Sequence, residues 1–477
     1  MSGDLTVHGP DRAGRPAVRD GDPMAWDADP ATWGTTPPPL GAGLAEDATA
    51  LAHYAAAAER ELATLPAVPQ RDRRQRDAAA RILQAARTLR DHFIAHHAEA
   101  VYDELTGARS VHLRIDALAR AAADRFPGLV PTRAQLDAER ALAQADKEGR
   151  EIDQGILFRG LLRSPTAGPH LTDAMLLPTR RALDLLSRFR RTGRLDLGVV
   201  LIERRGAAAH LTLRNTRCLN AEDDALVDDL ETAVDLTLLD DQVTVGVLRG
   251  GEMTHPRHAG RRVFSAGINL TDLREGRISF VDFLLRRELG PIGKITRGLL
   301  PVPGVESFPH RTVQKPWIGA VDSFAIGGGM QLLLVLDRVI ATEDAYFSLP
   351  AAQEGIVPGV ANLRLPRLTG ARAARRVILT GQVITATDPQ ASLVCDEVVP
   401  SDGMDAAVEA AVAAFDNPAV LANRRMLQLA EEPPERFQAY LAEFAVTQAL
   451  RLHSEDVIGR IARPRPEGDE RADDRPA

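Results

Sequence analysis

Hydrophobic and polar residues alternate with two different spacings along this chain, which divide it into a helical part and a mixed part. From about residue 43 to residue 194, apolar residues recur at spacings of three and four, as in DAAARILQAARTLRDHFIAHH. That period places them on one face of a helix. Prolines interrupt the pattern at five places: Pro66, Pro69, Pro127, Pro131 and Pro165. We therefore expect an all-helical N-terminal domain of about five or six helices over residues 43–194.

The spacing of apolar residues changes at residue 195, where short segments rich in β-branched residues begin. LGVVLIERR and AAAHLTLRN are separated by Arg205-Gly206 and predict a hairpin. NAEDDALVDDLETAVDLTLL predicts a helix with Asn220 as its N-cap. VTVGVLRGG and VFSAGINL each predict a strand, and KPWIGAVDSFAIGGGMQLLLVLDRVIAT predicts a strand, a glycine turn, a helix and a strand. This alternation favours an α/β core over residues 195–400.

The two ends of the chain have patterns of their own. Residues 1–42 are rich in Pro, Gly, Asp and Ala and predict a flexible arm. Residues 401–463 return to helical spacing and predict a C-terminal helical region, whereas the charged residues 464–477 predict a disordered tail. The expected fold is thus an α/β core with an all-helical N-terminal domain and C-terminal helices.

Composition narrows the class of protein without identifying it. Of 477 residues, 44% are hydrophobic and 26% charged, which is typical of a soluble globular protein. A net charge of −8 gives no reason to expect a nucleic-acid partner. Apolar runs such as residues 332–336 are too short to cross a bilayer, and the polar N-terminus lacks the apolar core of a signal peptide. Two cysteines, Cys218 and Cys395, form neither a disulfide framework nor a cysteine metal site, so we expect a cytoplasmic protein.

Two glycine turns, about sixty residues apart, are the candidates for chemistry. FSAGINL would expose the backbone N–H of Ile268, and AIGGGMQ, which opens an apolar helix, would expose that of Gly328. Two amides that converge on one oxygen form an oxyanion hole, in which a single donor contributes roughly 2.7–4 kcal/mol. A GGG run alone more often marks a tight turn or close helix packing. It is neither a Walker loop nor a dinucleotide fingerprint here.

Both turns lie within four ordered segments that resemble the crotonase (enoyl-CoA hydratase/isomerase) superfamily. FSAGINL and KPWIGAVDSFAIGGGMQL are followed by DRVIATEDAYFSLPAAQEGIVPG and RRVILTGQVITATDP. The resemblance covers about residues 197–400 and implies a ββα-repeat crotonase fold, an acyl-CoA substrate, and Ile268 and Gly328 as oxyanion-hole amides. Hydratases of this family use two glutamates as acid and base, but those positions hold Gln331 and Ala351. Since neither side chain exchanges a proton at neutral pH, we do not expect water addition.

Three features support a narrower resemblance. They are the helical N-terminal extension, the glutamine after the glycine turn and the segment SLPAAQEGIVPGVANLRL. These features are similar to one branch of the superfamily, the cofactor-independent dioxygenases of glycopeptide-antibiotic biosynthesis that act on (3,5-dihydroxyphenyl)acetyl-CoA. The resemblance implies a reaction with O₂, without metal or flavin, that yields (3,5-dihydroxyphenyl)glyoxylate and free CoA. It also implies Glu222 and Arg287 as substrate-binding residues, and Gln331 as a catalytic residue.

Each of these three side chains also has a purely structural interpretation. Glu222 begins a Glu-Asp-Asp run at a helix start, where a solvated acid interacts favourably with the helix dipole. Arg287 follows an apolar run and would form a surface salt bridge, and Gln331 would cap or pack. The acids at 228, 229 and 231 predict a wet helical face, since no histidine accompanies them at ligand spacing. Four cations suit either the CoA phosphates or ordinary surface charge: Arg261, Arg262, Lys294 and Arg297.

Two rival functions remain open from the sequence. One is another acyl-CoA enzyme on the same scaffold, such as a hydrolase, an isomerase or a decarboxylase, and the other is a non-catalytic acyl-CoA-binding protein. The resemblance further implies a homo-oligomer, a trimer or hexamer, for which we expect the helices after Pro418 to supply much of the interface. The N-terminal helices are expected to cover the site and exclude water. No carboxylate is expected near enough to reprotonate the enolate that the two amides hold.

Overall fold

The computed structural model of the protein describes residues 36–302 and 309–461. The arm predicted over residues 1–42 therefore lies mostly outside the described residues, and the tail predicted over 464–477 lies outside them entirely. The continuous stretch from residue 44 to 192 holds seven α-helices, where the proline spacing predicted about five or six. They are α1 (Leu44–Leu62), α2 (Arg73–Thr106), α3 (Ile115–Arg125), α4 (Arg133–Arg140), α5 (Glu151–Arg163), α6 (Ala167–Leu176) and α7 (Arg180–Thr192).

Local signals explain where the longest of these helices begins and ends. The side chain of Asp72 accepts a hydrogen bond from the Gln75 N–H at 2.8 Å, and the Gln75 side chain accepts one from the Asp72 N–H at 3.0 Å. This capping box occupies two backbone donors that the first turn leaves unpaired. Gly107 ends α2 with φ at 56°, a left-handed conformation that glycine adopts without strain.

The mixed part of the chain forms a seven-stranded sheet in the order β1-β2-β3-β4-β5-β7-β10. The first three strands are antiparallel and the rest are parallel. The predicted hairpin is confirmed, with Arg205 of β2 opposite Ala208 of β3. The strands are β1 (Arg194–Asp196), β2 (Val200–Arg205), β3 (Ala208–Leu213), β4 (Val245–Gly250), β5 (Trp317–Val321), β7 (Arg338–Thr342) and β10 (Glu397–Val399). A second sheet contains β6 (Phe324–Ile326), β8 (Tyr346–Ser348) and β9 (Ile384–Thr385).

Helices cover both faces of the large sheet, and the α/β class is thereby confirmed. On one face, α8 (Asp224–Leu239) and α7 share a core with the strands through buried residues such as Phe189, Ile202 and Leu230. On the other face, α15 (Met404–Phe415) packs through Met404 and Val408. Side chains of the buried parallel strands point into these two cores, which is why the strand segments read as nearly continuous hydrophobic runs.

Two of the predicted local features are wrong. Asn220 does not cap α8, because Asp223 accepts the hydrogen bond from the Leu226 N–H, at 2.9 Å. Asn220 is fully buried and donates from its side chain to the Val263 carbonyl at 2.7 Å. The segment VFSAGINL forms no regular strand. Isolated bridges join its Ser265 to Ala325 of β6, and its Ile268 to Glu222.

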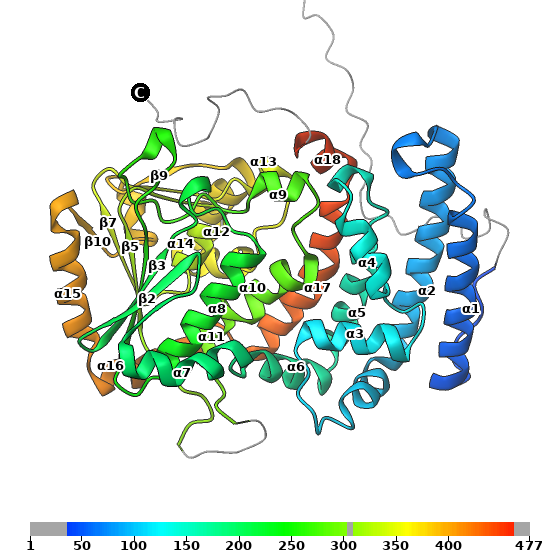
Figure 1. Ribbon diagram of the computed structural model, residues 1–477, viewed down its shortest axis with the longest axis horizontal. Coiled ribbons are helices and arrows are strands. Elements are labelled where there is room, and N and C mark those ends of the chain that lie inside the picture. Colours follow the sequence, from blue (N-terminus) through cyan, green and yellow to red (C-terminus); the bar gives the residue numbers. More distant parts are fainter. Residues whose placement is uncertain (1–35, 303–308, 462–477) are drawn as a thin grey trace, which may run out of the picture.

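One helix of the C-terminal part of the chain lies inside the molecule. Helix α17 (Pro434–Leu452) packs against α5, and a Cβ at Gly155 would come within 2.8 Å of the Ala445 carbonyl. In Figure 1, α17 (red) lies between the N-terminal helices (blue and cyan) at one end and the sheet at the other. The remaining helices include α9 (Leu270–Arg274), a π-helical turn (Phe280–Leu285), α10 (Arg286–Leu289), α11 (Pro291–Arg297), α12 (Gly328–Leu333), α13 (Ala351–Glu354), α14 (Ala361–Thr380), α16 (Pro418–Glu431) and α18 (Glu455–Ile461). Across the described residues, no helix combines the length and apolar character that a membrane span needs.

Candidate active site

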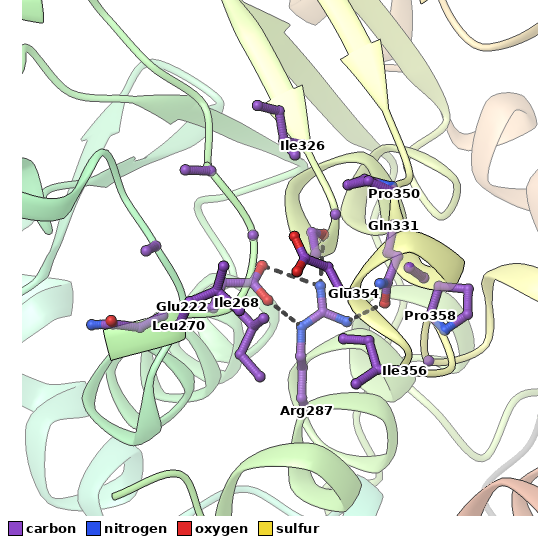
Figure 2. Close-up of a pocket in the computed structure, with 18 of the residues that line it drawn as sticks. Glu222, Ile268, Leu270, Arg287, Ile326, Gln331, Pro350, Glu354, Ile356 and Pro358 are labelled. Atoms are coloured by element: carbon purple, nitrogen blue, oxygen red, sulfur yellow. Dashed lines mark hydrogen bonds and ion pairs between the residues drawn. The ribbon is translucent and has the colours of Figure 1, made fainter. Parts of the chain in front are cut away.

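A cavity of about 390 Å³ opens where the two glycine turns meet α10, α13 and α17. Its wall is mostly apolar, with side chains such as Ile268, Phe283 and Phe444. Polar groups gather at one place in this wall, where five sequence-predicted residues lie together: Glu222, Ile268, Arg287, Gly328 and Gln331. Figure 2 labels four of them, Glu222, Ile268, Arg287 and Gln331, around the cavity. An apolar cavity with a few convergent polar groups is the usual form of a ligand site.

The two glycine turns are in direct contact. Gly267 has φ at 86° and Gly327 has φ at 53°, so both adopt a backbone conformation that side chains rarely allow. A Cβ at Gly267 would lie 3.3 Å from the Gly328 nitrogen and 3.1 Å from the Ile326 carbonyl oxygen. The bond from the Ile326 N–H to the Ser265 carbonyl, at 2.9 Å, joins the two segments just before the turns.

The backbone N–H groups of Ile268 and Gly328 are the free donors at this junction. Within residues 36–302 and 309–461, neither amide donates a hydrogen bond to another protein group. Gly328 is the first residue of α12, where an amide has no acceptor within the helix. Both residues line the cavity. The arrangement can therefore present two main-chain donors to one ligand oxygen.

Glu222 is buried beside these amides and is held from both its backbone and its side chain. Its N–H donates to the Gly267 carbonyl at 2.7 Å, and its carbonyl accepts from Asn269 at 2.9 Å. A Cβ at Gly328 would come within 2.1 Å of the Glu222 Oε2, so only glycine fits there. Glu222 is 4% exposed, and the interpretation of a solvated helix start is wrong for this residue.

Arg287 links the polar groups of the site. It is 6% exposed, so the surface salt-bridge interpretation is wrong for this residue too. Its Nε and Nη2 donate to Glu222 at 2.7 and 3.1 Å, and Nη2 also donates to the Gly328 carbonyl at 2.7 Å. Its Nη1 donates to Glu288 at 2.8 Å and to Gln331 at 3.0 Å. These bonds use all five N–H groups that a guanidinium has. Burial opposes the charge, but Glu222 and Glu288 outweigh it and raise the pKa of Arg287.

The bond from Arg287 also fixes which way the Gln331 amide faces. A guanidinium only donates, so the Gln331 Oε1 must point to Arg287. The Nε2 of Gln331 is then the part of the amide that remains for the cavity, which Gln331 lines. The side chain can donate hydrogen bonds to a bound ligand, but it cannot act as an acid or a base.

Three carboxylates line the cavity, of which the sequence predicted only Glu222. Besides Glu222, they are Glu288 on α10 and Glu354 at the end of α13. Sequence reasoning missed both. A signal for Glu354 existed, because it follows Ala351 by three residues, and residues at that spacing share a face of a helix.

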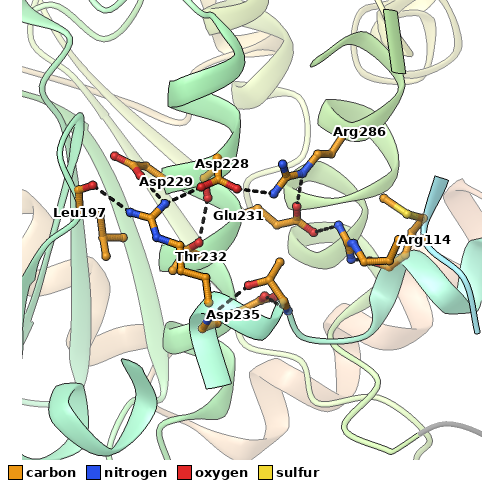
Figure 3. A network of polar contacts seen from close by, with 12 residues as sticks. Arg114, Leu197, Asp228, Asp229, Glu231, Thr232, Asp235 and Arg286 are labelled. Carbon is orange, nitrogen blue, oxygen red and sulfur yellow. Dashed lines mark hydrogen bonds and ion pairs between the residues drawn. The ribbon is translucent and has the colours of Figure 1, made fainter. Parts of the chain in front are cut away.

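Arg286, next to Arg287, anchors α10 to α8 through a buried ionic network (Figure 3). Its guanidinium donates to Glu231 and Asp228, each at 2.7 Å. Glu231 is completely buried, and Lys294 also pairs with it at 2.9 Å. Burial opposes ionisation of Glu231, but these cations outweigh it and hold its pKa far below its usual value. The prediction of a wet helical face is therefore wrong for Glu231, and also for Asp229, which is 6% exposed.

Two of the four cations suggested for the CoA phosphates are internal. Lys294 is fully buried and pairs with Glu231 and with Asp235, the latter at 2.6 Å. Arg297 lies over the Phe437 ring and pairs with Glu432 at 2.5 Å. Both residues are thus unsuited to a phosphate, whereas Arg217 and His255 line the cavity itself.

The N-terminal helices were expected to cover the site, and the lining of the cavity does not support this expectation. No described residue of α1–α7 lines it. Phe444 and Gln448 of α17 and Phe283 and Leu284 of the π-helical turn do so instead. Five of the N-terminal helices, α1, α2, α3, α5 and α6, share a core with these two elements. In the part of the chain that the structure describes, no cluster of three or more His, Cys, Asp or Glu side chains could hold a metal ion.

The chain is similar to several known proteins. The enoyl-CoA hydratase/isomerase family model matches residues 309–437. The (3,5-dihydroxyphenyl)acetyl-CoA 1,2-dioxygenase of Amycolatopsis orientalis is 58% identical over 415 residues, which are 87% of this chain and 95% of that protein. A probable enoyl-CoA hydratase of Rhizobium meliloti (strain 1021) is 31% identical over 250 residues, 51% of this chain and 87% of its own. A crystal structure of enoyl-CoA hydratase from Bacillus halodurans matches 55% of this chain and 99% of its own, with 20% identity and a TM-score of 0.46.

The extent of these matches decides the family. The dioxygenase is aligned over nearly its whole length at high identity, so the similarity includes the helices before the α/β core as well as the core itself. The hydratase is aligned over most of its length at lower identity and over only half of this chain. The chain belongs to the crotonase (enoyl-CoA hydratase/isomerase) superfamily.

Proposed function

We propose that the protein is a dioxygenase that converts (3,5-dihydroxyphenyl)acetyl-CoA and O₂ to (3,5-dihydroxyphenyl)glyoxylate and CoA. The observation that carries the proposal is the 58% identity, over 95% of its length, to a protein named as the 1,2-dioxygenase of that thioester. The site supports it, because Gln331 and Ala351 leave no acid–base pair at the hydratase positions while the two amides remain available.

The first task of such an enzyme is to stabilise an enolate. The α-carbon of an arylacetyl thioester lies between the carbonyl and the ring, both of which delocalise the charge left by a lost proton. In the proposal, the Ile268 and Gly328 amides donate to the thioester oxygen, where most of that charge develops. Such donors are worth roughly 2.7–4 kcal/mol each at a transition state. The largely apolar wall strengthens them by excluding water.

The enolate then reacts with O₂ without a metal or a flavin. One electron passes from the electron-rich α-carbon to O₂, and recombination forms a peroxide at that carbon. The peroxide attacks the thioester carbonyl and CoA leaves as the thiolate. Cleavage of the O–O bond, with loss of the second α-proton, gives the ketone and the carboxylate. Of the two α-hydrogens, one ends on the CoA thiol and the other is released as a proton, so the reaction balances.

Glu222 is the residue that we propose to bind a ring hydroxyl. Its two oxygens each accept one bond from Arg287, and a carboxylate offers about four acceptor sites in all. Arg287 has no unused donor, and we therefore propose that it acts on the substrate by holding Glu222 and Gln331 in place. Gln331 would donate from Nε2 to the oxygens that become the carboxylate of the product.

The proposal also includes a cytoplasmic location and a homo-oligomer, a trimer or hexamer. The two cysteines are free thiols, which agrees with a reducing compartment. For the oligomer, the support is the exposed apolar side chains of α16, where Met426, Leu427 and Leu429 are 59–65% exposed. Exposed apolar groups of this size on one helix favour an interface between proteins.

Simultaneous measurement of O₂ and thiol tests the function. Purified protein is treated with a chelator and mixed with the dihydroxyphenylacetyl thioester in an oxygen-electrode cell while free thiol is followed. We expect one O₂ consumed for each thiol released. Thiol release without O₂ uptake would indicate a hydrolase, and the absence of both would indicate a binding protein; either result contradicts the proposal.

A further inference from the structure

Glu354 is a carboxylate in the cavity for which the proposed function has no role yet. It ends the short helix α13, and its side chain lines the same cavity as the two free amides. Figure 2 shows the carboxylate directed into the cavity. Glu354 lies one helical turn after Ala351, the position at which hydratases of this superfamily carry a catalytic glutamate.

The backbone around Glu354 is held by the C-terminal helices. Gly355 ends α13 with φ at 81°, and its carbonyl accepts from Arg451 of α17 at 2.5 Å. Arg460 of α18 donates to the Ala352 and Gln353 carbonyls at 3.0 and 2.5 Å. These bonds attach α13 to α17 and α18, which fixes the direction from which the Glu354 side chain enters the cavity.

The other two carboxylates of the cavity are less accessible to a ligand than Glu354. Glu222 is paired with Arg287 through both of its oxygens. Glu288 accepts from Arg287 at 2.8 Å and from Arg364 at 3.4 Å. Both are also nearly inaccessible, with 4% and 1% of their surface exposed, whereas Glu354 is only partly buried.

We propose that Glu354 is the general base that removes the α-proton of the bound arylacetyl thioester. The Cα–H bond breaks, its electron pair moves toward the carbonyl oxygen held by the two amides, and the proton is transferred to a Glu354 oxygen. When the CoA thiolate leaves later in the reaction, that proton passes to its sulfur and Glu354 is ready for the next turnover. This inference rests on the proposed function, and it assigns the step that precedes any contact with O₂.

The test follows the α-proton in the absence of O₂. Protein and (3,5-dihydroxyphenyl)acetyl-CoA are incubated anaerobically in D₂O, and exchange of the α-hydrogens is measured by NMR or mass spectrometry. We expect exchange in the wild type and a loss of at least about 10²-fold in Glu354→Gln, the size typical of a general base. Glu354→Asp should keep part of the rate. The control is Glu343→Gln, which makes the same change at an exposed glutamate outside the cavity.

The outcomes separate this inference from the function on which it rests. If the wild type exchanges its α-hydrogens and Glu354→Gln does so at the same rate, Glu354 is not the base. If the wild type neither exchanges them nor consumes O₂ in air, the proposed function is wrong. A folded Glu354→Gln protein is recognised by an unchanged unfolding temperature and unchanged affinity for the thioester, so that a slow variant reports on proton transfer alone.

Discussion

At the scale of single residues, the site depends on a close approach that only glycine allows. The backbone of Gly328 faces the Glu222 carboxylate so closely that a methyl group would occupy the same space, 2.1 Å from Oε2. Arg287 donates to the carbonyl of Gly328 and to that carboxylate, so the position of the free amide and that of the buried acid are coupled.

Gly328→Ala tests this coupling. The new methyl group must displace Glu222 or the turn, and the amide then no longer points at the thioester oxygen. We expect kcat/KM to fall by roughly 10²–10³-fold, the usual effect of losing one oxyanion-hole donor. Gly459→Ala is the matched control, since a Cβ at Gly459 meets nothing within 4 Å. Equal rates in both variants would place the chemistry elsewhere.

Gln331→Glu tests the donor role of the amide. The variant keeps an oxygen for Arg287 but replaces the Nε2 donor with a second oxygen and adds negative charge beside the enolate. Because a hydrogen bond to a charged group is worth about 1.5–3 kcal/mol, kcat should fall by roughly 10–100-fold with little change in KM. Gln242→Glu, on an exposed turn, should leave kcat unchanged. A wild-type kcat in Gln331→Glu would remove Gln331 from the mechanism.

The sequence identified some of the residues in this cavity and not others. Ile268 and Gly328 were predictable because a glycine turn reveals its backbone geometry in the sequence itself. The burial of Glu222 and Arg287 was not predictable from their neighbours, since an acid at a helix start and an arginine after an apolar run are usually solvated. Glu288 and Glu354 were missed because their place in the cavity depends on how α10 and α13 pack, which local pattern does not contain.

At the scale of elements, a partly buried histidine lies where the end of α17 meets the N-terminal part of the chain. His453 follows α17, and a Cβ at Gly149 would lie 3.1 Å from its ring. Gln144 donates to the neighbouring Leu452 carbonyl at 3.1 Å. Burial, with a smaller contribution from Arg87, lowers the pKa of His453 from 6.5 to about 3.

This histidine predicts a loss of stability in mild acid. In the unfolded chain His453 takes up a proton below pH 6.5, whereas in the folded protein it stays neutral down to about pH 3. Its contribution to stability is therefore complete above pH 6.5 and is lost as the pH falls from 6.5 toward 3. Between pH 7 and pH 5, we expect the unfolding temperature of the wild type to fall more steeply than that of His453→Gln. Parallel slopes would show that His453 is charged in the fold.

Elements were easier to predict than their partners. The hairpin at Arg205-Gly206 followed from two β-rich segments and a turn. The segment at Ser265 did not become a regular strand, because its partners are β6 and the residues before α8, which pair with it only through isolated bridges. The cap of α8 was misplaced by three residues, since Asn220 and Asp223 are both good N-cap residues and only the fold decides between them.

At the scale of the whole molecule, distant parts of the chain share one core. Apolar residues of α1, α2, α3, α5, α6, the π-helical turn and α17 pack together, although α17 follows α6 by more than 250 residues. An amphipathic pattern shows that a helix has an apolar face but not which surface covers it. For that reason the N-terminal helices were expected over the cavity, whereas α17 and the π-helical turn line it.

The apolar surface of α16 leads to a prediction about assembly. Met426 and Leu429 are 65% and 59% exposed in the single chain. Charges placed there should disfavour an interface, so we expect Met426→Glu combined with Leu429→Glu to shift the mass measured by light scattering toward the monomer. The control is Leu183→Glu on α7, at a leucine that is 48% exposed. A wild type that is already monomeric, or an unchanged mass in the double variant, would contradict the proposed oligomer.

The most direct measurement is a crystal structure with an unreactive CoA analogue in which the thioester sulfur is replaced but the carbonyl is kept. The account predicts that the carbonyl oxygen lies about 2.7–3.1 Å from the backbone nitrogens of both Ile268 and Gly328, the distances of an oxyanion hole. An analogue bound in the cavity with its carbonyl oxygen directed away from both nitrogens would contradict it.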